Sequence, residues 1–542
     1  GADRWVDFRR SGLRESAREL LSRWIAEEEV VLRGHDLKEV LRLVPAPGTA
    51  RCGLEDAMLH AYILNPVLKG YSLEELSLDA LQHKLMTPKE AGWKQGEEPL
   101  AGDSTLLELV GERLDACGQL ARHYRKELRA DEDLERVYRE IEAPLVPVLV
   151  EMEETGIGLD VELLREMSRQ MGEELDELES EIFEIAGEEF NLNSPQQLGA
   201  VLFEKLDYPV IKRTKKTKSP STDAESLEEL AARGFDLPQR LLRYRELTKL
   251  RSTYVDALPQ LVQDDGRLHT RFHQAVAATG RLSSAEPNLQ NIPVREGEGR
   301  EIRKAFVAPA ERLLLVADYS QIELRVLAHI AEEEAMIEAF REGRDIHSAT
   351  ASRVFGVARE LVGPDQRRAA KVINFGIVYG MTPYGLAKTL QVTPGEAKKF
   401  IEAYLERYPG VRRYTEETLE RAEEEGKVET LYGRIRWLPE LQSSNYMVRE
   451  NGKRMAINAR IQGTAADLLK LAMVEVHRRL REERPETRLL LTVHDELVFE
   501  TPAEGVEAVA GLVREEMEEI AELTVPLEVE TGWGRNWYEA KG

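Results

Sequence analysis

Two acidic groups stand where buried strands are expected to end. Residues 313–317 form a short, wholly apolar run typical of a buried strand, and Asp318 follows it directly. Residues 489–500 form two apolar runs separated by a polar tip at 494–496, which predicts a hairpin with Asp495 at its turn. If this hairpin pairs beside the first strand, the two carboxylates converge, and because they repel each other they favour divalent cations. Such sites typically hold two ions about 3.5–4 Å apart. The alternative is two unrelated acids at strand ends.

A helix face with cations at one end and aromatic rings at the other is predicted within residues 365–381. Arg367, Lys371, Phe375 and Tyr379 recur at intervals of four residues, so they share one face of a helix. Cations near a helix start oppose the helix dipole, which a purely structural helix has little reason to accept. The pattern suits a triphosphate on the cations and a base stacked on the rings.

Further stretches carry side chains suited to nucleic acid. Residues 212–218 are the most basic run of the chain and predict a phosphate-gripping tip, although a solvated loop is the alternative. Its cations are Lys212, Arg213, Lys215, Lys216 and Lys218. Residues 278–293 predict irregular loops whose Arg281, Gln290 and Asn291 can bond base edges and phosphates. On a helix predicted at 453–463, Arg454, Asn458 and Gln462 share one face and can reach minor-groove acceptors, unless that face is merely solvated.

Three of these segments resemble known motifs. Residues 318–325, 367–376 and 493–496 are similar, in this order, to the three polymerase motifs of the bacterial DNA polymerase I family (family A). The resemblance runs from about residue 140 to the C-terminus. It implies template-directed DNA synthesis in replication and repair, in which dNTPs are added to the 3′-OH of a primer–template DNA and pyrophosphate leaves. It also implies two Mg²⁺ ions, for which Mn²⁺ can substitute.

The resemblance also implies residue roles. Metal ligands would be Asp318, Asp495 and the backbone carbonyl of Tyr319, with Glu496 and Lys371 as further catalytic groups. The dNTP-binding residues would be Gln321, Glu323, His347, Arg367, Lys371, Phe375 and Tyr379. Lys249, Arg251, Ser252, Tyr254 and His494 would join the DNA-binding residues named above.

The elements that must position these residues predict an α+β fold. The resemblance implies a polymerase right hand at 141–542, with the thumb at about 150–265, the palm at about 266–332 and 441–542, and the fingers at about 333–440. By position, residues 1–140 resemble an RNase H-like 3′–5′ exonuclease domain, with helical patterns at 20–31 and 106–128. Val40 and Gly111 stand where the family has an acid and a tyrosine, so this domain is expected to lack proofreading. Asp56 or Asp115 alone cannot form a two-metal nuclease site.

Composition restricts the remaining possibilities. The 542 residues carry a net charge of −25, which argues against nonspecific DNA coating but allows binding through local basic patches. Two cysteines, Cys52 and Cys117, fit a reducing cytoplasm and exclude a disulfide framework. No apolar run approaches a membrane span. Together with this composition, the resemblance implies a monomer in the bacterial cytoplasm, associated with the nucleoid. A catalytically silent DNA-binding scaffold and a nuclease are the alternatives.

Overall fold

The computed structural model describes residues 19–43, 52–92, 104–214, 216–293 and 297–541. The chain forms two compact units, each of which mixes helices with strands, as the predicted α+β class requires. The first comprises Gly1–Gly156, Thr270–Gln290 and Glu311–Trp533, and the second comprises Ile157–His269, Asn291–Ala310 and Gly534–Gly542. Among the described residues, no helix combines the length and apolar character that a membrane crossing needs.

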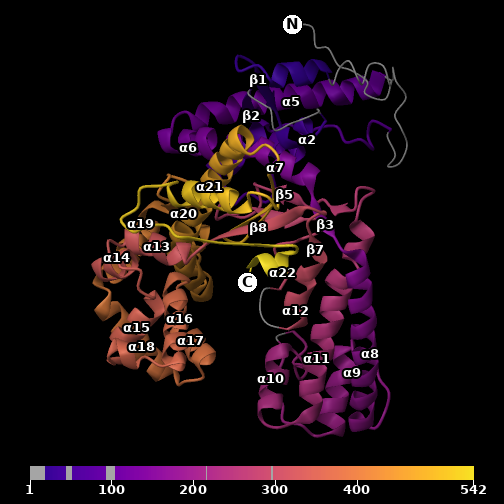
Figure 1. The fold of residues 1–542 in the computed structure, drawn as a ribbon, viewed down its shortest axis with the longest axis vertical. Coiled ribbons are helices and arrows are strands. Elements are labelled where there is room, and N and C mark those ends of the chain that lie inside the picture. The colour runs from indigo at the N-terminus through magenta and orange to yellow at the C-terminus, as the bar shows by residue number, and fades with distance from the viewer. Residues whose placement is uncertain (1–18, 44–51, 93–103, 215, 294–296, 542) are drawn as a thin grey trace. The chain divides into compact units, whose positions relative to one another are not determined.

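A four-stranded sheet is the centre of the first unit (Figure 1). Its order is β11 (Arg488–Val493), β12 (Glu496–Pro502), β8 (Arg312–Tyr319) and β13 (Val529–Gly534). Residues 314–317 of β8 are at most 2% exposed, because helices cover this part of the sheet. The expected hairpin is present: β12 runs antiparallel to both β11 and β8.

Two helices pack near this sheet and lead to the polar residues. Helix α13 (Ile322–Ile330) leaves β8 through Gln321, whose φ of 55° makes a sharp left-handed turn. Helix α20 (Tyr446–Glu483) spans 38 residues and contains the predicted helix 453–463; Asn445 caps its start by accepting a hydrogen bond from the Met447 N–H. Helix α20 also contacts α13 and α21 (Val506–Glu518).

A helical group fills residues 334–425. It consists of α14 (Glu334–Arg341), α15 (Ile346–Phe355), α16 (Pro364–Val378), α17 (Pro383–Leu390), α18 (Pro394–Arg407) and α19 (Pro409–Glu425). Helix α16 begins with Pro364, whose missing N–H is not needed in a first turn. It packs against α15, and Figure 1 shows both among α17 and α18.

The N-terminal region differs from its predicted pattern in one place. The helix expected at 20–31 ends at Ile25, and Val31 opens β1 (Val31–Gly34), which pairs in parallel with β2 (Gly53–Asp56). Pairing with a distant strand therefore overrides the local helical periodicity. The second expected helix is present as α5 (Ser104–Leu128). Helices α2 (Leu37–Leu41), α3 (Ala57–Leu64) and α7 (Ala143–Thr155) complete the part used below.

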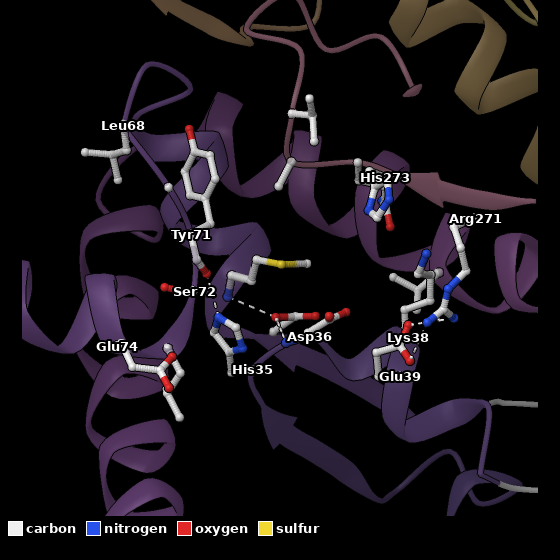
Figure 2. Close-up of a pocket in the computed structure, with 18 of the residues that line it drawn as sticks. His35, Asp36, Lys38, Glu39, Leu68, Tyr71, Ser72, Glu74, Arg271 and His273 are labelled. Atoms are coloured by element: carbon white, nitrogen blue, oxygen red, sulfur yellow. Dashed lines mark hydrogen bonds and ion pairs between the residues drawn. The ribbon is translucent and has the colours of Figure 1, made fainter. Parts of the chain in front are cut away.

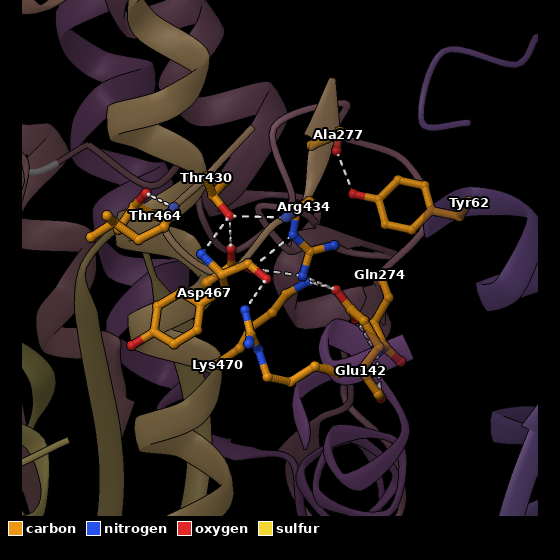
Figure 3. Close-up of polar contacts among 12 residues, drawn as sticks. Tyr62, Glu142, Gln274, Ala277, Thr430, Arg434, Thr464, Asp467 and Lys470 are labelled. Carbon is orange, nitrogen blue, oxygen red and sulfur yellow. Dashed lines mark hydrogen bonds and ion pairs between the residues drawn. The ribbon is translucent and has the colours of Figure 1, made fainter. Parts of the chain in front are cut away.

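A buried charge network joins this N-terminal region to α20 (Figure 3). Glu142 ends the π-helix η2 (Val137–Glu142), and its Oε1 lies 2.6 Å from both Lys470 Nζ and Arg434 Nη2. Arg434 also donates from Nε to Asp467 at 2.7 Å, and Gln274 donates to the other Glu142 oxygen at 2.6 Å. The two acidic and two basic side chains are at most 3% exposed, so each charge depends on its partners.

The second unit is mainly helical. Its long helix α8 (Val161–Ala186) is rich in acidic residues, and Asp160 caps it by accepting the Leu163 N–H. Helices α10 (Ala224–Ala232) and α11 (Asp236–Leu250) follow, and α11 continues into the π-helix η4 (Arg251–Val255). Three short strands, β3 (Ile157–Leu159), β4 (Arg267–Leu268) and β7 (Phe306–Val307), form a small sheet in the order β4-β3-β7.

Candidate active site

The sheet register brings the two predicted metal-binding acids together. Glu496 stands directly opposite Asp318 in the β12–β8 pair, and the Tyr319 N–H donates to the Asp495 carbonyl oxygen at 3.1 Å. His494, with φ 55°, makes the turn that precedes Asp495. Asp318 and Asp495 are both half-buried, whereas Glu496 is buried. Asp318 and Asp495 thus lie at the same end of two hydrogen-bonded strands.

Hydrogen bonds from Tyr319 and Arg325 stabilise the turn that follows β8. The Tyr319 hydroxyl donates to the Met517 carbonyl at 2.7 Å, which fixes the end of the strand. Arg325, 3% exposed in its side chain, donates to the carbonyls of Ser320 at 2.8 Å and Pro526 at 2.6 Å. Sequence reasoning gave Arg325 no role of its own, although a cation inside an apolar helix pattern signals a buried anchor.

Helix α16 presents the predicted cationic and aromatic face. Arg367 and Lys371 are exposed, Phe375 is half-buried, and Tyr379 lies one residue beyond the last helical residue. The rings of Phe375 and Tyr379 stack with centroids 6.2 Å apart, and the His347 ring lies 5.9 Å from Phe375. His347 therefore lies beside the same face, although it comes from α15.

The Asp345 carboxylate pairs with Arg367 at the start of this face. Asp345 caps α15 by accepting the Ser348 N–H, and it also accepts from Arg367 Nε at 3.1 Å and Nη2 at 2.6 Å. Although partial burial alone would raise it, these partners lower the pKa of Asp345 to about 2. Asp345 was not among the predicted site residues, although its position two residues before His347 could have indicated it.

Glu323, on the first turn of α13, is shared between two predicted site residues. It pairs with Arg281 Nη2 at 2.5 Å and is 5% exposed in its side chain. Burial first, and then the neighbouring Glu323 charge, raise the pKa of the Tyr379 hydroxyl. Oε2 of Glu323 and Oε1 of Gln321 are buried and accept no hydrogen bond from the described residues. Glu323, Arg281 and Tyr379 are thus brought together.

The remaining predicted DNA-binding residues of the first unit lie in different settings. Asn458 has a buried Oδ1 without a hydrogen-bond donor among the described residues, and Arg454 donates to Asn451 at 3.0 Å. Gln462 is half-buried on the same helix, and His494 is exposed. Gln290 instead supports the fold: it donates to the Thr492 carbonyl at 3.1 Å and accepts from the Ser284 N–H.

The second unit holds the other predicted DNA contacts. Lys212 pairs with Asp223 at 2.9 Å and Glu225 at 2.8 Å, and Arg213 donates to the Lys218 carbonyl at 3.0 Å. Lys216 and Lys218 are exposed, and Lys215 lies outside the described residues.

Beyond this tip, Lys249 is exposed in the last turn of α11, and Ser252 donates to the carbonyl of Thr248 at 2.7 Å. Arg251 lies 3.3 Å from Asp256, and Tyr254 donates to the Asn291 carbonyl at 2.6 Å. Ser252, Arg251 and Tyr254 therefore contact other residues of the same unit.

A cavity of about 900 Å³ is lined by residues of the N-terminal region together with residues 271–276 (Figure 2). Its lining includes His35, Asp36, Asp56 and His273, but not Val40, Gly111 or Asp115. Asp56, 1% exposed, accepts hydrogen bonds from the backbone N–H groups of Asp36, Leu37 and Met58. The bond from Met58 caps the start of α3. Asp115 is exposed and accepts from Gln119 at 2.7 Å.

Asp318 and Asp495 suit Mg²⁺ better than a metal that takes all its ligands from protein side chains. No cluster of three or more His, Cys, Asp or Glu arranged to hold a metal occurs among the described residues. Mg²⁺ is commonly bound by only one or two carboxylates together with substrate phosphates and water. Asp318 and Asp495, as converging oxygen donors, fit this pattern.

Comparison with known proteins gives one consistent result. Residues 161–539 match the sequence family described as DNA polymerase family A. DNA polymerase I from Pseudomonas aeruginosa is 47% identical over 506 residues, and the thermostable DNA polymerase I from Thermus aquaticus is 48% identical over 488 residues. These alignments cover 92% and 90% of this chain but 55% of each relative, so the chain spans about half the length of these proteins.

A solved structure is similar over nearly the whole chain. The POL domain of Pol1 from M. smegmatis, in complex with DNA primer-template and dNTP, superposes with a TM-score of 0.89 at 38% identity. The match covers 97% of this chain and 90% of that one. The sequence match over residues 161–539 and this shared fold show that the chain belongs to DNA polymerase family A, as its three motifs predict.

Proposed function

We propose that the chain carries out template-directed DNA synthesis, transferring deoxynucleoside monophosphates from dNTPs to the 3′-OH of a primer. The observation that carries this proposal is the convergence of Asp318 and Asp495 at one end of two paired strands. The α16 face, with Arg367 and Lys371, adds a cationic surface suited to a triphosphate. The similar Pol1 domain binds primer-template and dNTP, which supports the same substrates here.

The chain's own residues would act mainly by positioning and neutralising charge, as phosphoryl transfer requires. Asp318 and Asp495, with the Tyr319 carbonyl, would hold two Mg²⁺ ions, and Glu496 would support them. When bound, the ions would activate the 3′-OH and neutralise charge on the triphosphate. Arg367, Lys371 and His347 would bind the phosphates. Phe375 and Tyr379 would pack against the nucleotide, and Glu323 would stand where a ribose 2′-OH would need space.

The assignment of domains belongs to the same proposal. Residues 1–140 would be a degenerate exonuclease-like domain, and the palm, fingers and thumb would follow at the boundaries given above. Asp56 supports this assignment because its carboxylate is committed to three backbone N–H groups. Lys216 and Lys218, exposed at the tip of the second unit, remain available for phosphates.

Primer extension and exonuclease assays on one preparation test the proposal. Mg²⁺-dependent extension of a primer in template order is the expected result. DNA binding without extension would instead indicate a silent scaffold. A labelled primer with a 3′ mismatch, incubated with Mg²⁺ and without dNTP, should keep its full length, because Val40 and Gly111 replace the nuclease groups. Metal-dependent shortening that copurifies with the protein would contradict this last expectation.

A further inference from the structure

A buried chain of four polar side chains ends at His347, and neither the motifs nor the proposed reaction accounts for it. Tyr408 hydroxyl lies 3.0 Å from Thr350 Oγ1, and Thr350 Oγ1 lies 3.1 Å from Asn374 Oδ1. Asn374 Nδ2 lies 3.0 Å from His347 Nδ1. All four residues are at most 3% exposed. They come from α15, from α16 and from the junction between α18 and α19.

The direction of these hydrogen bonds follows from counting donors. With the Asn374 carbonyl toward Thr350, Tyr408 donates to Thr350, Thr350 donates to Asn374, and the Asn374 amide donates to His347 Nδ1. If the amide were reversed, Asn374 would donate to Thr350, and the Thr350 and Tyr408 hydroxyls could form only one hydrogen bond with each other. The described residues offer neither hydroxyl another acceptor, so one buried proton would be left unpaired. Because an unpaired buried donor is destabilising, the first direction is favoured.

The direction of these hydrogen bonds decides which ring nitrogen of His347 carries its proton. Burial, followed by the nearby Lys371 and Arg367, lowers the pKa of His347 to about 4, and Asp345 opposes this only in part. The ring is therefore neutral at pH 7 and carries one proton. Because Nδ1 accepts from Asn374, that proton must be on Nε2. No hydrogen bond to Nε2 occurs within the described part of the chain.

We infer that Asn374 is a positioning residue that fixes His347 in the Nε2–H tautomer, so that the ring donates a hydrogen bond to the triphosphate of the incoming nucleotide. This inference rests on the proposed function, because it needs His347 beside the phosphates. A neutral donor there adds a directed hydrogen bond between the two cations of α16 without adding another positive charge. Thr350 and Tyr408 in turn fix the orientation of the Asn374 amide.

The free protein tests the tautomer without any nucleotide. The protein has ten histidines. In ¹⁵N-histidine-labelled protein, the His347 signals are the ones that disappear in the His347→Gln variant. The expected spectrum shows protonated Nε2 and unprotonated Nδ1 at pH 8. The opposite tautomer would overturn the inference. Thr350→Val should give a mixture of both tautomers because the amide can then turn, and Thr350→Ser should restore the single form.

Reversing the polarity of residue 374 tests the consequence for nucleotide binding. In Asn374→Asp, the carboxylate only accepts, so Nδ1 must carry the proton. Above the pKa of the ring, Nε2 then turns a lone pair toward the phosphates. The new carboxylate raises the pKa of the ring in this variant. The KM for dNTP should therefore rise at least tenfold as the pH passes through this raised pKa, and it should stay nearly constant between pH 7 and pH 9 in the parent protein. The charged groups near His347 are Asp345, Arg367 and Lys371, and they are the same in both proteins.

The His347→Gln background separates positioning from simple structural damage. A glutamine amide keeps a donor and does not titrate, so adding Asn374→Asp there should leave the KM independent of pH. An equal rise in KM in both backgrounds would overturn the inference. If Asn374→Asp does not fold, the Thr350→Val and Thr350→Ser spectra decide the tautomer alone. A correct tautomer with no change of KM in His347→Ala would instead contradict the proposed phosphate role of His347.

Discussion

The closeness of Asp318 and Asp495 gives the most direct test at the scale of single residues. Replacing either with Ala should lower the extension rate by about a thousandfold or more, because loss of a shared metal ligand costs several kcal/mol of barrier. Primer–template binding should change little. Single-turnover extension and DNA titration measure the two effects separately.

Glu504 provides the matched control for these variants. It is exposed just beyond the other end of β12, away from Asp318 and Asp495. Glu504→Ala should extend primers at the parental rate. If Asp318→Ala or Asp495→Ala stays within about tenfold of the parent, a barrier change of only about 1.4 kcal/mol, the two-metal assignment is wrong.

Sugar selection is expected to depend on Glu323 and Phe375 in different ways. Glu323 lies beside Tyr379 and is proposed to occupy the space that a 2′-OH would need, so Glu323→Ala should improve the rNTP-to-dNTP ratio at least tenfold. Phe375→Tyr should relax discrimination against ddNTPs and leave ribose rejection largely unchanged. Single-nucleotide incorporation with dNTP, rNTP and ddNTP measures both ratios. An unchanged rNTP ratio in Glu323→Ala would show that this acid does not exclude ribose.

At the scale of elements, the sequence predicted the strands and helices that depend only on residues close together in the chain. The apolar run before Asp318, the hairpin around Asp495 and the spacing on α16 each depend on one short segment, and β8, β11, β12 and α16 formed accordingly. The helix expected through Val31 did not form there, because that residue pairs with Gly53 of β2. The Asp345–Arg367 pair and the Asn374 chain were also missed, because each joins segments at least 22 residues apart.

The basic tip of the second unit is an element whose role can be measured by salt. Lys216→Gln together with Lys218→Gln should weaken primer–template binding similarly for any sequence. The salt dependence should flatten by up to about 0.9 in slope for each lost phosphate contact. Lys205→Gln is the control, because Lys205 is paired with Glu188 at 3.0 Å. An unchanged slope in the double variant would mean that the tip is a solvated loop.

At the scale of the first unit, stability should depend on the buried Glu142 network. Glu142→Gln leaves Lys470 and Arg434 with Asp467 as their remaining acid, and breaking a buried pair costs about 3–5 kcal/mol. Glu140→Gln is the control, because Glu140 is exposed on the same turn. Urea unfolding monitored by circular dichroism should give a clearly lower midpoint for the first variant only. Similar midpoints would show that Gln274 and water compensate for the lost charge.

The same network predicts how the first unit responds to acid. Burial alone would raise the pKa of Glu142, but Lys470 and Arg434 lower it to about 2. Because the folded-state pKa is below the ordinary value, the stabilisation is present above about pH 4.5 and is lost as the pH falls toward 2. Glu142→Gln should therefore show less acid sensitivity in this range than the parent protein.

Glu142 also sets the smallest fragment that can be expected to work. The family match begins at residue 161, which invites a minimal enzyme trimmed to the recognisable polymerase motifs. Such a fragment would remove the counterion of Lys470 and Arg434 while leaving both cations in the interior. Glu142, which lies before the start of the family match, thus neutralises cations in the interior of the matched region. A truncation that keeps this charge balance must begin before η2, or replace Lys470 with a neutral side chain in the same step, so that Arg434 remains paired with Asp467.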